Sequence, residues 1–366
     1  MAINVVFRSV TIPAHTQSRN KKNFHDGQTM NFKNYLNSGI SVLNYYLFNK
    51  KTPLSVILSV TSKCNFNCKY CHVGNQKKKN MTTKQILSLI DQMVDAGTQR
   101  LGIQGGEPLL RKDIGKIINY SKSKGLFVTL GSNGSLLPGK INKVKNVDAL
   151  VLSFDGPSAH DRYRKKGSYR QLIGAIKLAR ENNINVWNTT VLSKYSINDI
   201  DEVLRLAKEM GFKTYFAPLM QVPETTGIIN EFFPTQEEQK RAIKKIIKRK
   251  KQGYPILNSY EFLDYVYKWP DFRKTQFLNE ELPKKNKLKC FASELFCHID
   301  TNGDVYPCIN MMYKTKAYNA LKVGFKKAFE KASKNGCNGC TTFSFVELNL
   351  LFNLKFRAIY NLLKDY

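Results

Sequence analysis

The sequence contains few acidic residues for its length and no long apolar run. Asp and Glu together number 28 against 58 Lys and Arg, so the 366 residues carry a formal net charge of +30. No stretch of about 18 uninterrupted apolar residues is present, which argues against a polytopic membrane protein. The apolar segment near the N-terminus, residues 3–7, is too short for the core of a secretory signal. These absences favour a cytoplasmic protein with a strongly positive surface.

The residues that are plentiful exclude wholesale disorder. Hydrophobic residues make up 42% of the chain and include 22 Phe and 18 Tyr, enough to bury a large core. The length predicts about two domains, or one large domain with an appendage. The positive charge would attract nucleic acid, an anionic membrane or an acidic peptide, and a Lys-rich solvated surface explains it equally well.

Cysteine is missing from residues 72–289 and is concentrated in two groups on either side. A secreted disulfide protein is short and rich in cysteine throughout, unlike this chain. Two separate thiol groups in a cytosolic protein indicate metal or iron–sulfur ligands instead. The eight cysteines are Cys64, Cys68, Cys71, Cys290, Cys297, Cys308, Cys337 and Cys340.

Strand-like and helix-like patterns alternate between residues 54 and 218. Such alternation predicts an α/β fold with a parallel sheet, helices outside it, and function at the carboxyl ends of the strands. The expected strands are 54–60, 101–103, 126–130, 149–154, 186–192 and 214–218, and the expected helices follow Thr82 and cover 113–124, 169–182 and 200–210.

The patterns divide the chain into five predicted regions. The N-terminal extension, 1–52, combines a poorly ordered stretch at 1–29 with an amphipathic helix at 30–50. The strand–helix region covers 53–220, and a connector at 221–289 contains a basic helix at 237–251 followed by clustered aromatic residues. The remaining regions are a Cys-rich segment at 290–342 and a C-terminal amphipathic helix at 343–366.

The cysteines of the first group are spaced C-x3-C-x2-C and directly follow the first predicted strand. Three thiolates on one loop supply three of the four ligands of a [4Fe–4S] cluster and leave one iron open. The motif Cys64, Cys68, Tyr70 and Cys71 resembles that of the radical S-adenosylmethionine (SAM) superfamily. The resemblance implies a partial (β/α)6-type barrel, SAM bound at the open iron, and its reductive cleavage to a 5′-deoxyadenosyl radical that abstracts hydrogen from substrate. A zinc site is the alternative.

Further segments at predicted strand ends resemble SAM-binding motifs of the same superfamily. The Gly105, Gly106 and Glu107 motif is expected to hold the SAM amino group with backbone and carboxylate acceptors. The resemblance makes Asn133 and Ser153 candidates for the SAM ribose or carboxylate, with loop capping as the alternative. Arg164 is a candidate for the carboxylate, with the same alternative, and Asp155 and His160 lie in the same stretch.

The second cysteine group resembles the SPASM/twitch extension of radical SAM enzymes. Residues 300–305 read as a hairpin turn around Gly303, placed between Cys297 and Cys308. The full SPASM form has about seven cysteines and two clusters, whereas five are available here. We therefore expect one auxiliary [4Fe–4S] cluster, with Cys297 as a competing ligand or a buried thiol and structural zinc as the alternative. The preferred ligands are Cys290, Cys308, Cys337 and Cys340.

These patterns predict a radical SAM enzyme with a small C-terminal auxiliary-cluster domain. A peptide or protein substrate is favoured, with a lipid or other small molecule next, and an electron donor such as flavodoxin or ferredoxin is expected. The C-terminal helix either packs on the barrel or rests on an anionic membrane, which would make the cytoplasmic enzyme peripheral. Nucleic acid is disfavoured, although a non-catalytic zinc or iron–sulfur protein that holds nucleic acid on its basic face is the rival interpretation.

Overall fold

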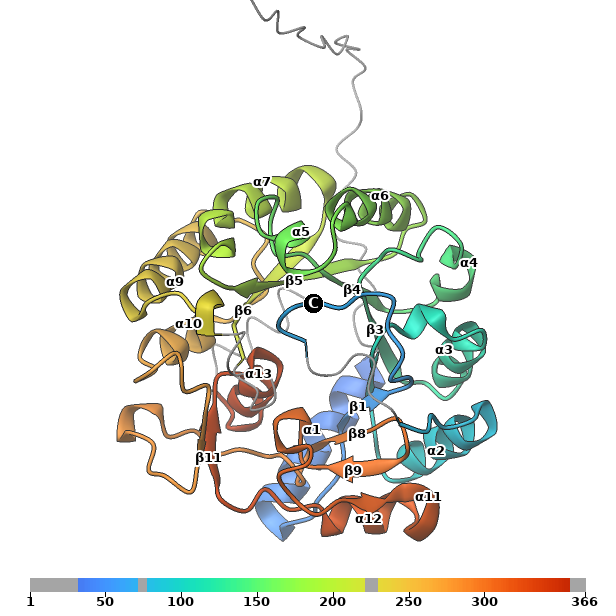
Figure 1. Ribbon diagram of the computed structural model, residues 1–366. Coiled ribbons are helices and arrows are strands. Elements are labelled where there is room, and N and C mark those ends of the chain that lie inside the picture. Colours follow the sequence, from blue (N-terminus) through green and yellow to red (C-terminus); the bar gives the residue numbers. More distant parts are fainter. Residues whose placement is uncertain (1–31, 72–77, 221–229, 356–366) are drawn as a thin grey trace, which may run out of the picture.

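Six parallel strands form the centre of the molecule in the computed structural model, which describes residues 32–71, 78–220 and 230–355. They lie side by side in the order of the sequence, and each pairs with the next in a parallel register. Figure 1 shows the sheet curving around a central space with helices outside it. The strands are β1 (Ser55–Ser59), β2 (Arg100–Gln104), β3 (Phe127–Ser132), β4 (Ala149–Ser153), β5 (Val186–Leu192) and β6 (Lys213–Pro218).

The outer helices match the predicted alternation. The helix that follows Thr82 begins with a capping box, in which Thr82 and Gln85 satisfy each other's backbone amides. The helices on the outer face are α2 (Thr83–Asp95), α3 (Ile114–Ser123), α4 (Ile141–Val144), α6 (Ser168–Glu181) and α7 (Ile200–Met210). The predicted partial α/β barrel is therefore confirmed.

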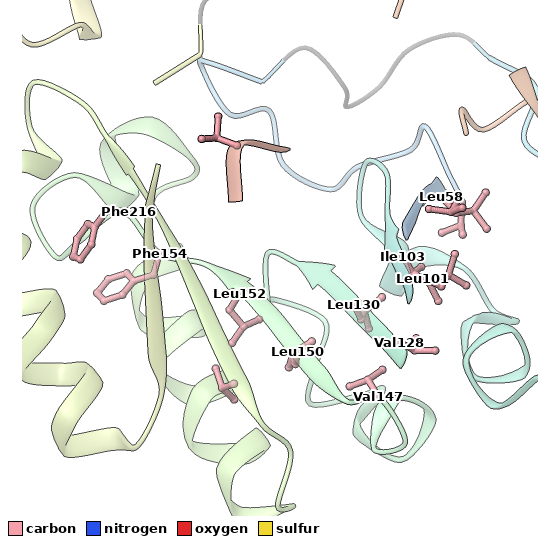
Figure 2. Packing of buried hydrophobic residues seen from close by; sticks show 14 of the residues in the cluster. Leu58, Leu101, Ile103, Val128, Leu130, Val147, Leu150, Leu152, Phe154 and Phe216 are labelled. Carbon is pink, nitrogen blue, oxygen red and sulfur yellow. The ribbon is translucent and has the colours of Figure 1, made fainter. Parts of the chain in front are cut away.

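The main core lies between the sheet and the outer helices because successive side chains of a strand point to opposite faces. Figure 2 shows alternate residues of the central strands in this layer: Leu101, Ile103, Val128, Leu130, Leu150 and Leu152. The residues between them face the inside of the barrel, and several of these are small. Gly102, Thr129, Gly131 and Thr189 all border an internal cavity. The sheet thus builds its core on the outer face and keeps its inner face open.

The predicted hairpin around Gly303 extends the barrel sheet. The strand β8 (Phe296–Ile299) pairs in parallel with β1, and β9 (Asp304–Tyr306) returns antiparallel to β8. At the turn, Gly303 has φ +91°, and a Cβ there would approach Leu321 to 2.9 Å. Beyond it come β10 (Tyr318–Asn319), α11 (Ala320–Val323) and α12 (Phe325–Lys331), while β11 (Cys337–Cys340) pairs with β7 (Gln276–Leu278).

The connector continues the ring beyond β6. The predicted basic helix is present as α9 (Gln236–Lys251), and α10 (Tyr260–Tyr267) follows it. Ala242, Ile243 and Ile246 of α9 are buried, while Lys245 and Arg249 form ion pairs with Asp201 of α7. Two of the basic side chains of this helix are therefore paired with an acidic residue of the same protein.

The C-terminal helix is shorter than predicted, and its described part belongs to the core. The helix α13 spans Phe343–Phe352 and ends near Leu354, which has φ +55°. Asn349 is buried, and its Oδ1 accepts a hydrogen bond from the Phe291 amide. This part of the helix packs on the barrel, one of the two alternatives given by the sequence, and the Asn349 side chain satisfies a buried backbone group. Residues 356–366 of the predicted helix lie outside the described residues.

The N-terminal helix α1 (Phe32–Phe48) lies within the segment predicted at 30–50 and contacts the end of α13. Its Tyr46 hydroxyl donates to the Phe352 carbonyl, while Leu43 and Leu47 remain exposed. The predicted disorder of residues 1–29 concerns residues outside the described ranges. Within those ranges, every helix is too short or too polar to cross a membrane.

Candidate active site

The loop that follows β1 carries the cysteine triad to the mouth of a cavity inside the barrel. Cys64, Cys68 and Cys71 all border this cavity, which has a volume of about 520 Å³ and is called the barrel cavity below. Of the predicted SAM-binding residues, all but Glu107 also border it: Tyr70, Gly105, Gly106, Asn133, Ser153 and Arg164. The structure thus brings together side chains that are 100 residues apart in the sequence.

Gly105 and Gly106 lie against the backbone of the cysteine loop. The Gly106 amide donates to the Thr61 carbonyl at 2.7 Å, and the Glu107 amide donates to the Lys63 carbonyl at 2.8 Å. A Cβ on Gly105 would lie 2.3 Å from the Thr61 oxygen, and one on Gly106 would lie 2.2 Å from the Lys63 oxygen. Both glycines are required because only their backbones can approach the loop this closely.

The Glu107 carboxylate lies behind these glycines and is directed into the protein. Its Oε1 accepts from the Leu109 amide and the Ser132 hydroxyl, and its Oε2 accepts from the Asn133 amide at 2.8 Å. Burial raises the pKa of Glu107, and these hydrogen bonds oppose that rise. The carboxylate joins the ends of β2 and β3, and the contact of Glu107 with SAM stays a prediction.

Asn133 connects the end of β3 to the cysteine loop. Its Nδ2 donates to the Oδ1 of Asn65, a residue between two of the cysteines, at 2.9 Å. The Asn65 amide group in turn donates to the Ser135 hydroxyl, which donates to the Asn133 Oδ1 at 2.7 Å. The loop-capping alternative therefore accounts for these contacts of Asn133.

Tyr70 and Arg164 meet the buried carboxylate of Asp155 beside Cys68. The Tyr70 hydroxyl donates to Asp155 Oδ2 at 2.7 Å, and Arg164 Nε donates to the same oxygen at 2.7 Å. Asp155 is fully buried, and its Oδ1 also accepts from the Val191 amide. This arrangement fixes the aromatic residue of the cysteine motif to the ends of β4 and β5, with a cation next to the thiol.

The cysteine loop suits an iron–sulfur cluster in its donor chemistry. Burial raises the pKa of the Cys68 thiol to about 11, and Arg164 opposes the rise. A bound cluster would stabilise the thiolate form that such a thiol does not adopt alone. Within the described ranges no three His, Cys, Asp or Glu side chains converge as one metal ion would require. A four-iron cluster takes each thiolate on a different iron, so it accepts more widely spaced ligands.

The second cysteine group gathers around a separate, small enclosed cavity. Cys290, Cys308, Cys337 and Cys340 all border it. Burial raises the pKa of Cys340 to about 12, and the neighbouring Cys290 and Cys337 add to the rise. Four thiols that border one cavity form a donor set that fits a metal cluster, whereas no three of them converge as a single zinc ion would require in the described part of the chain.

Cys297 lies elsewhere. It is fully buried in the main core from its position on β8, and burial alone raises its pKa. Its neighbours on the strand, Phe296 and His298, point to the other face, and Phe296 borders the second cavity. The strand alternation thus separates Cys297 from the other four cysteines.

Sequence reasoning missed the residues at the deep end of the barrel cavity. Phe127, Trp187 and Tyr215 border it from the early parts of β3, β5 and β6, and Phe343 and Glu347 border it from α13. The four aromatic rings form a series. The ring centroids lie 6.3 Å apart for Phe127 and Trp187 and 5.0 Å apart for Tyr215 and Phe343. Glu347 had one available signal, since it is the lone charged residue in the apolar helix α13.

Comparisons with known proteins identify the class. The profile of the Radical SAM superfamily matches residues 58–207, which contain the cysteine loop and most of the barrel. Residues 58–207 are therefore a Radical SAM domain, and the protein is a radical SAM enzyme. Enzymes of the superfamily bind a [4Fe–4S] cluster and SAM.

Individual relatives add more detail. The chain is 27% identical over 288 residues to the AdoMet-dependent heme synthase of Methanosarcina barkeri, covering 70% of this chain and 76% of that protein. It is 24% identical to the PqqA peptide cyclase of Rhizobium meliloti, covering 74% and 76%. The fold resembles Streptococcus suis SuiB bound to its precursor peptide SuiA, with a TM-score of 0.62, 18% identity, and 89% and 78% coverage.

Removal of the buried Asp155 carboxylate should destabilise the site strongly. We expect Asp155→Ala to lower the free energy of unfolding by about 3–5 kcal/mol, because it leaves Arg164 buried without its counter-ion. Tyr70→Phe removes one hydrogen bond to the same carboxylate and should cost about 1 kcal/mol. Urea unfolding of the anaerobically prepared proteins measures both values. An Asp155→Ala protein as stable as the Tyr70→Phe protein would contradict this description.

Single changes in the second cysteine group should separate its members. Ala in place of Cys290, Cys308, Cys337 or Cys340 should reduce iron from about eight towards about four per chain, because each change opens the four-thiol cavity. Cys297→Ala serves as the matched control and should keep its iron, because Cys297 lies in the main core. Iron and sulfide analysis of each purified variant gives the result. Loss of iron in the control with retention in Cys337→Ala would show that the ligand set is wrong.

Proposed function

We propose that this radical SAM enzyme abstracts hydrogen from a peptide that enters the barrel cavity. The observation that carries the proposal is the position of the cysteine triad at the mouth of a cavity that follows the barrel interior. In the proposal, Cys64, Cys68 and Cys71 hold the cluster. Cys290, Cys308, Cys337 and Cys340 hold one auxiliary [4Fe–4S] cluster.

The chain's own residues have separate tasks in this proposal. The Asp155–Arg164 pair holds Tyr70 and places a positive charge next to Cys68, while the Gly105 and Gly106 backbone fixes the other side of the loop. Ser153 and Arg164 border the cavity where SAM would lie. When bound, the cluster and SAM supply the electron transfer and the radical that this chemistry requires. The protein orients the cluster and SAM and encloses them in the barrel cavity.

A peptide is favoured by the names of related proteins. The Rhizobium meliloti relative is a peptide cyclase, and the SuiB structure contains a precursor peptide. The heme synthase relative raises a tetrapyrrole as the competing substrate class. The proposal concerns a carbon–hydrogen bond of the substrate. A peptide and a tetrapyrrole, each labelled with deuterium, are therefore compared. The one that transfers its deuterium into 5′-deoxyadenosine belongs to the substrate class.

The electron donor is proposed to be an acidic protein such as a flavodoxin or ferredoxin. The net charge of +30 would attract such a partner and increase its rate of association at low salt. The exposed basic residues of α9 that are free of the Asp201 ion pairs, including Lys248 and Lys251, suit this contact. The same positive charge would also attract an anionic membrane, and binding experiments with vesicles would detect that contact.

The first test is reductive cleavage of SAM. The anaerobically reconstituted enzyme should be brown and should release 5′-deoxyadenosine when reduced with dithionite in the presence of SAM. Replacing Cys64, Cys68 or Cys71 with Ala should abolish this product, while iron bound by the second cysteine group remains. Product formation is followed by liquid chromatography. A colourless protein that contains zinc would support the rival interpretation, and full product formation in any one variant would refute the ligand assignment.

A further inference from the structure

The deep end of the barrel cavity carries a carboxylate that the radical chemistry does not use. Glu347 is the one acidic residue among the described residues that border the cavity. It lies on α13 one helical turn after Phe343, which packs against Tyr215 on the first half of β6. The cysteine loop lies at the opposite, carboxyl end of the strands. Glu347 is therefore placed at the far end of the cavity from the cysteine triad.

Glu347 forms a hydrogen bond but no ion pair within the described part of the chain. Its Oε1 accepts this hydrogen bond from the Ser259 amide at 2.8 Å. Lys250 and Glu261 are the neighbouring charged groups, and the Lys250 Nζ donates to the Ile256 carbonyl at 2.7 Å. Burial raises the pKa of Glu347 to about 7. A carboxylate that lines a cavity with apolar walls is stabilised in its charged form when a cation binds beside it.

The walls next to Glu347 suit a cationic group on an apolar stem. Trp187, Tyr215 and Phe343 present aromatic rings, and ring faces attract ammonium and guanidinium groups. The space between them and the cysteine loop is open because Gly102 and Gly131 occupy inward-facing positions in β2 and β3. A Cβ at Gly102 would meet its nearest atom at 3.5 Å, so this glycine is not required by backbone crowding.

Two cationic residues, Arg164 and Arg100, also border the cavity. Arg164 lies at the mouth, paired with Asp155. Arg100 begins β2, and its guanidinium lies 5.4 Å from the centre of the Phe127 ring. Arg100 therefore borders the same deep end of the cavity as Glu347, and no ion pair joins the two among the described residues.

We propose that Glu347 binds an ammonium or guanidinium group of the substrate, carried on an apolar stem that lies along Trp187, Tyr215 and Phe343. The inference deepens the proposed function and rests on it, because it takes the barrel cavity as the substrate site. A cation fixed at the deep end sets how far the rest of the substrate reaches towards the cysteine triad. Glu347 is thereby a specificity-determining residue, and the substrate is a peptide with a basic side chain or a free amine.

Matched probes test this proposal by calorimetry on the reconstituted enzyme. The probes are Nα-acetyl-lysine N-methylamide against its norleucine counterpart, and phenethylamine against 2-phenylethanol. Each pair differs chiefly in the cationic nitrogen, and the two pairs distinguish a peptide-borne cation from a free amine. We expect the enzyme to bind at least one cationic probe at least tenfold more tightly than its neutral partner. Equal binding within both pairs would overturn the proposal without any variant.

Substitutions then locate the preference. Glu347→Gln keeps an acceptor for the Ser259 amide and removes the charge, so it should abolish the tenfold preference while leaving the neutral probe bound as before. Glu330→Gln, at an exposed position of α12, is the matched control and should keep the preference. Gly102→Leu, which fills the middle of the cavity, should weaken binding of every probe. Retention of the preference in Glu347→Gln would overturn the assignment.

The outcomes separate this inference from the proposed function. An enzyme that forms 5′-deoxyadenosine but does not distinguish the probes refutes the role of Glu347 alone. An enzyme that distinguishes the probes but never cleaves SAM refutes the proposed radical chemistry and leaves the cation site standing. Circular dichroism of each variant checks that a change in binding reflects the side chain and not loss of the fold.

Discussion

The close contact between the cysteine loop and the ends of the barrel strands is the constraint on which the rest of the structure depends. The loop after β1 touches the Gly105–Gly106 backbone at the end of β2, Asn133 at the end of β3 and Asp155 at the end of β4. The contact at β2 requires glycines, because a Cβ there would clash with the loop. The contact at β4 depends on the ion pair between Asp155 and Arg164 beside a thiol. Because three strands hold the loop, the positions of its thiols are set by the sheet.

The same sheet explains why the inside of the barrel is available for binding. Large side chains such as Leu101 and Leu130 point outward into the helix layer, whereas Gly102, Thr129 and Gly131 point inward. A closed α/β barrel usually fills its interior with branched side chains, and this partial barrel does not. Helix α13 borders the deep end instead, which gives a cavity with the cysteine loop at one end and Glu347 at the other. Binding at one end and reaction at the other follow from this geometry.

Much of the fold was predictable because its signals are local. The alternation of strand and helix patterns, the cysteine spacing and the turn at Gly303 each depend on neighbouring residues, and the structure agrees with them. Contacts between distant residues were not predictable in the same way. Glu107 bonds Ser132 and Asn133 across two strand ends, and nothing in its own motif indicates this.

Asn349 and Glu347 show the same limitation on one helix. A polar residue on an apolar helix has the same sequence pattern whether it meets water, a buried amide or an internal cavity. Asn349 meets the Phe291 amide, and Glu347 borders the barrel cavity. The end of α13 near Leu354 was equally hidden, because the apolar spacing of the sequence continues beyond it.

The account's central claim is that the cysteine loop holds the cluster to which SAM binds. Electron paramagnetic resonance of the dithionite-reduced enzyme, recorded with and without SAM, tests it most directly. SAM should change the spectrum of one [4Fe–4S] cluster and leave a second signal unaltered. A variant with Ala at Cys64, Cys68 and Cys71 should show only the second signal. A wild-type spectrum that SAM does not alter, or a SAM-sensitive signal that persists in the variant, would contradict the claim.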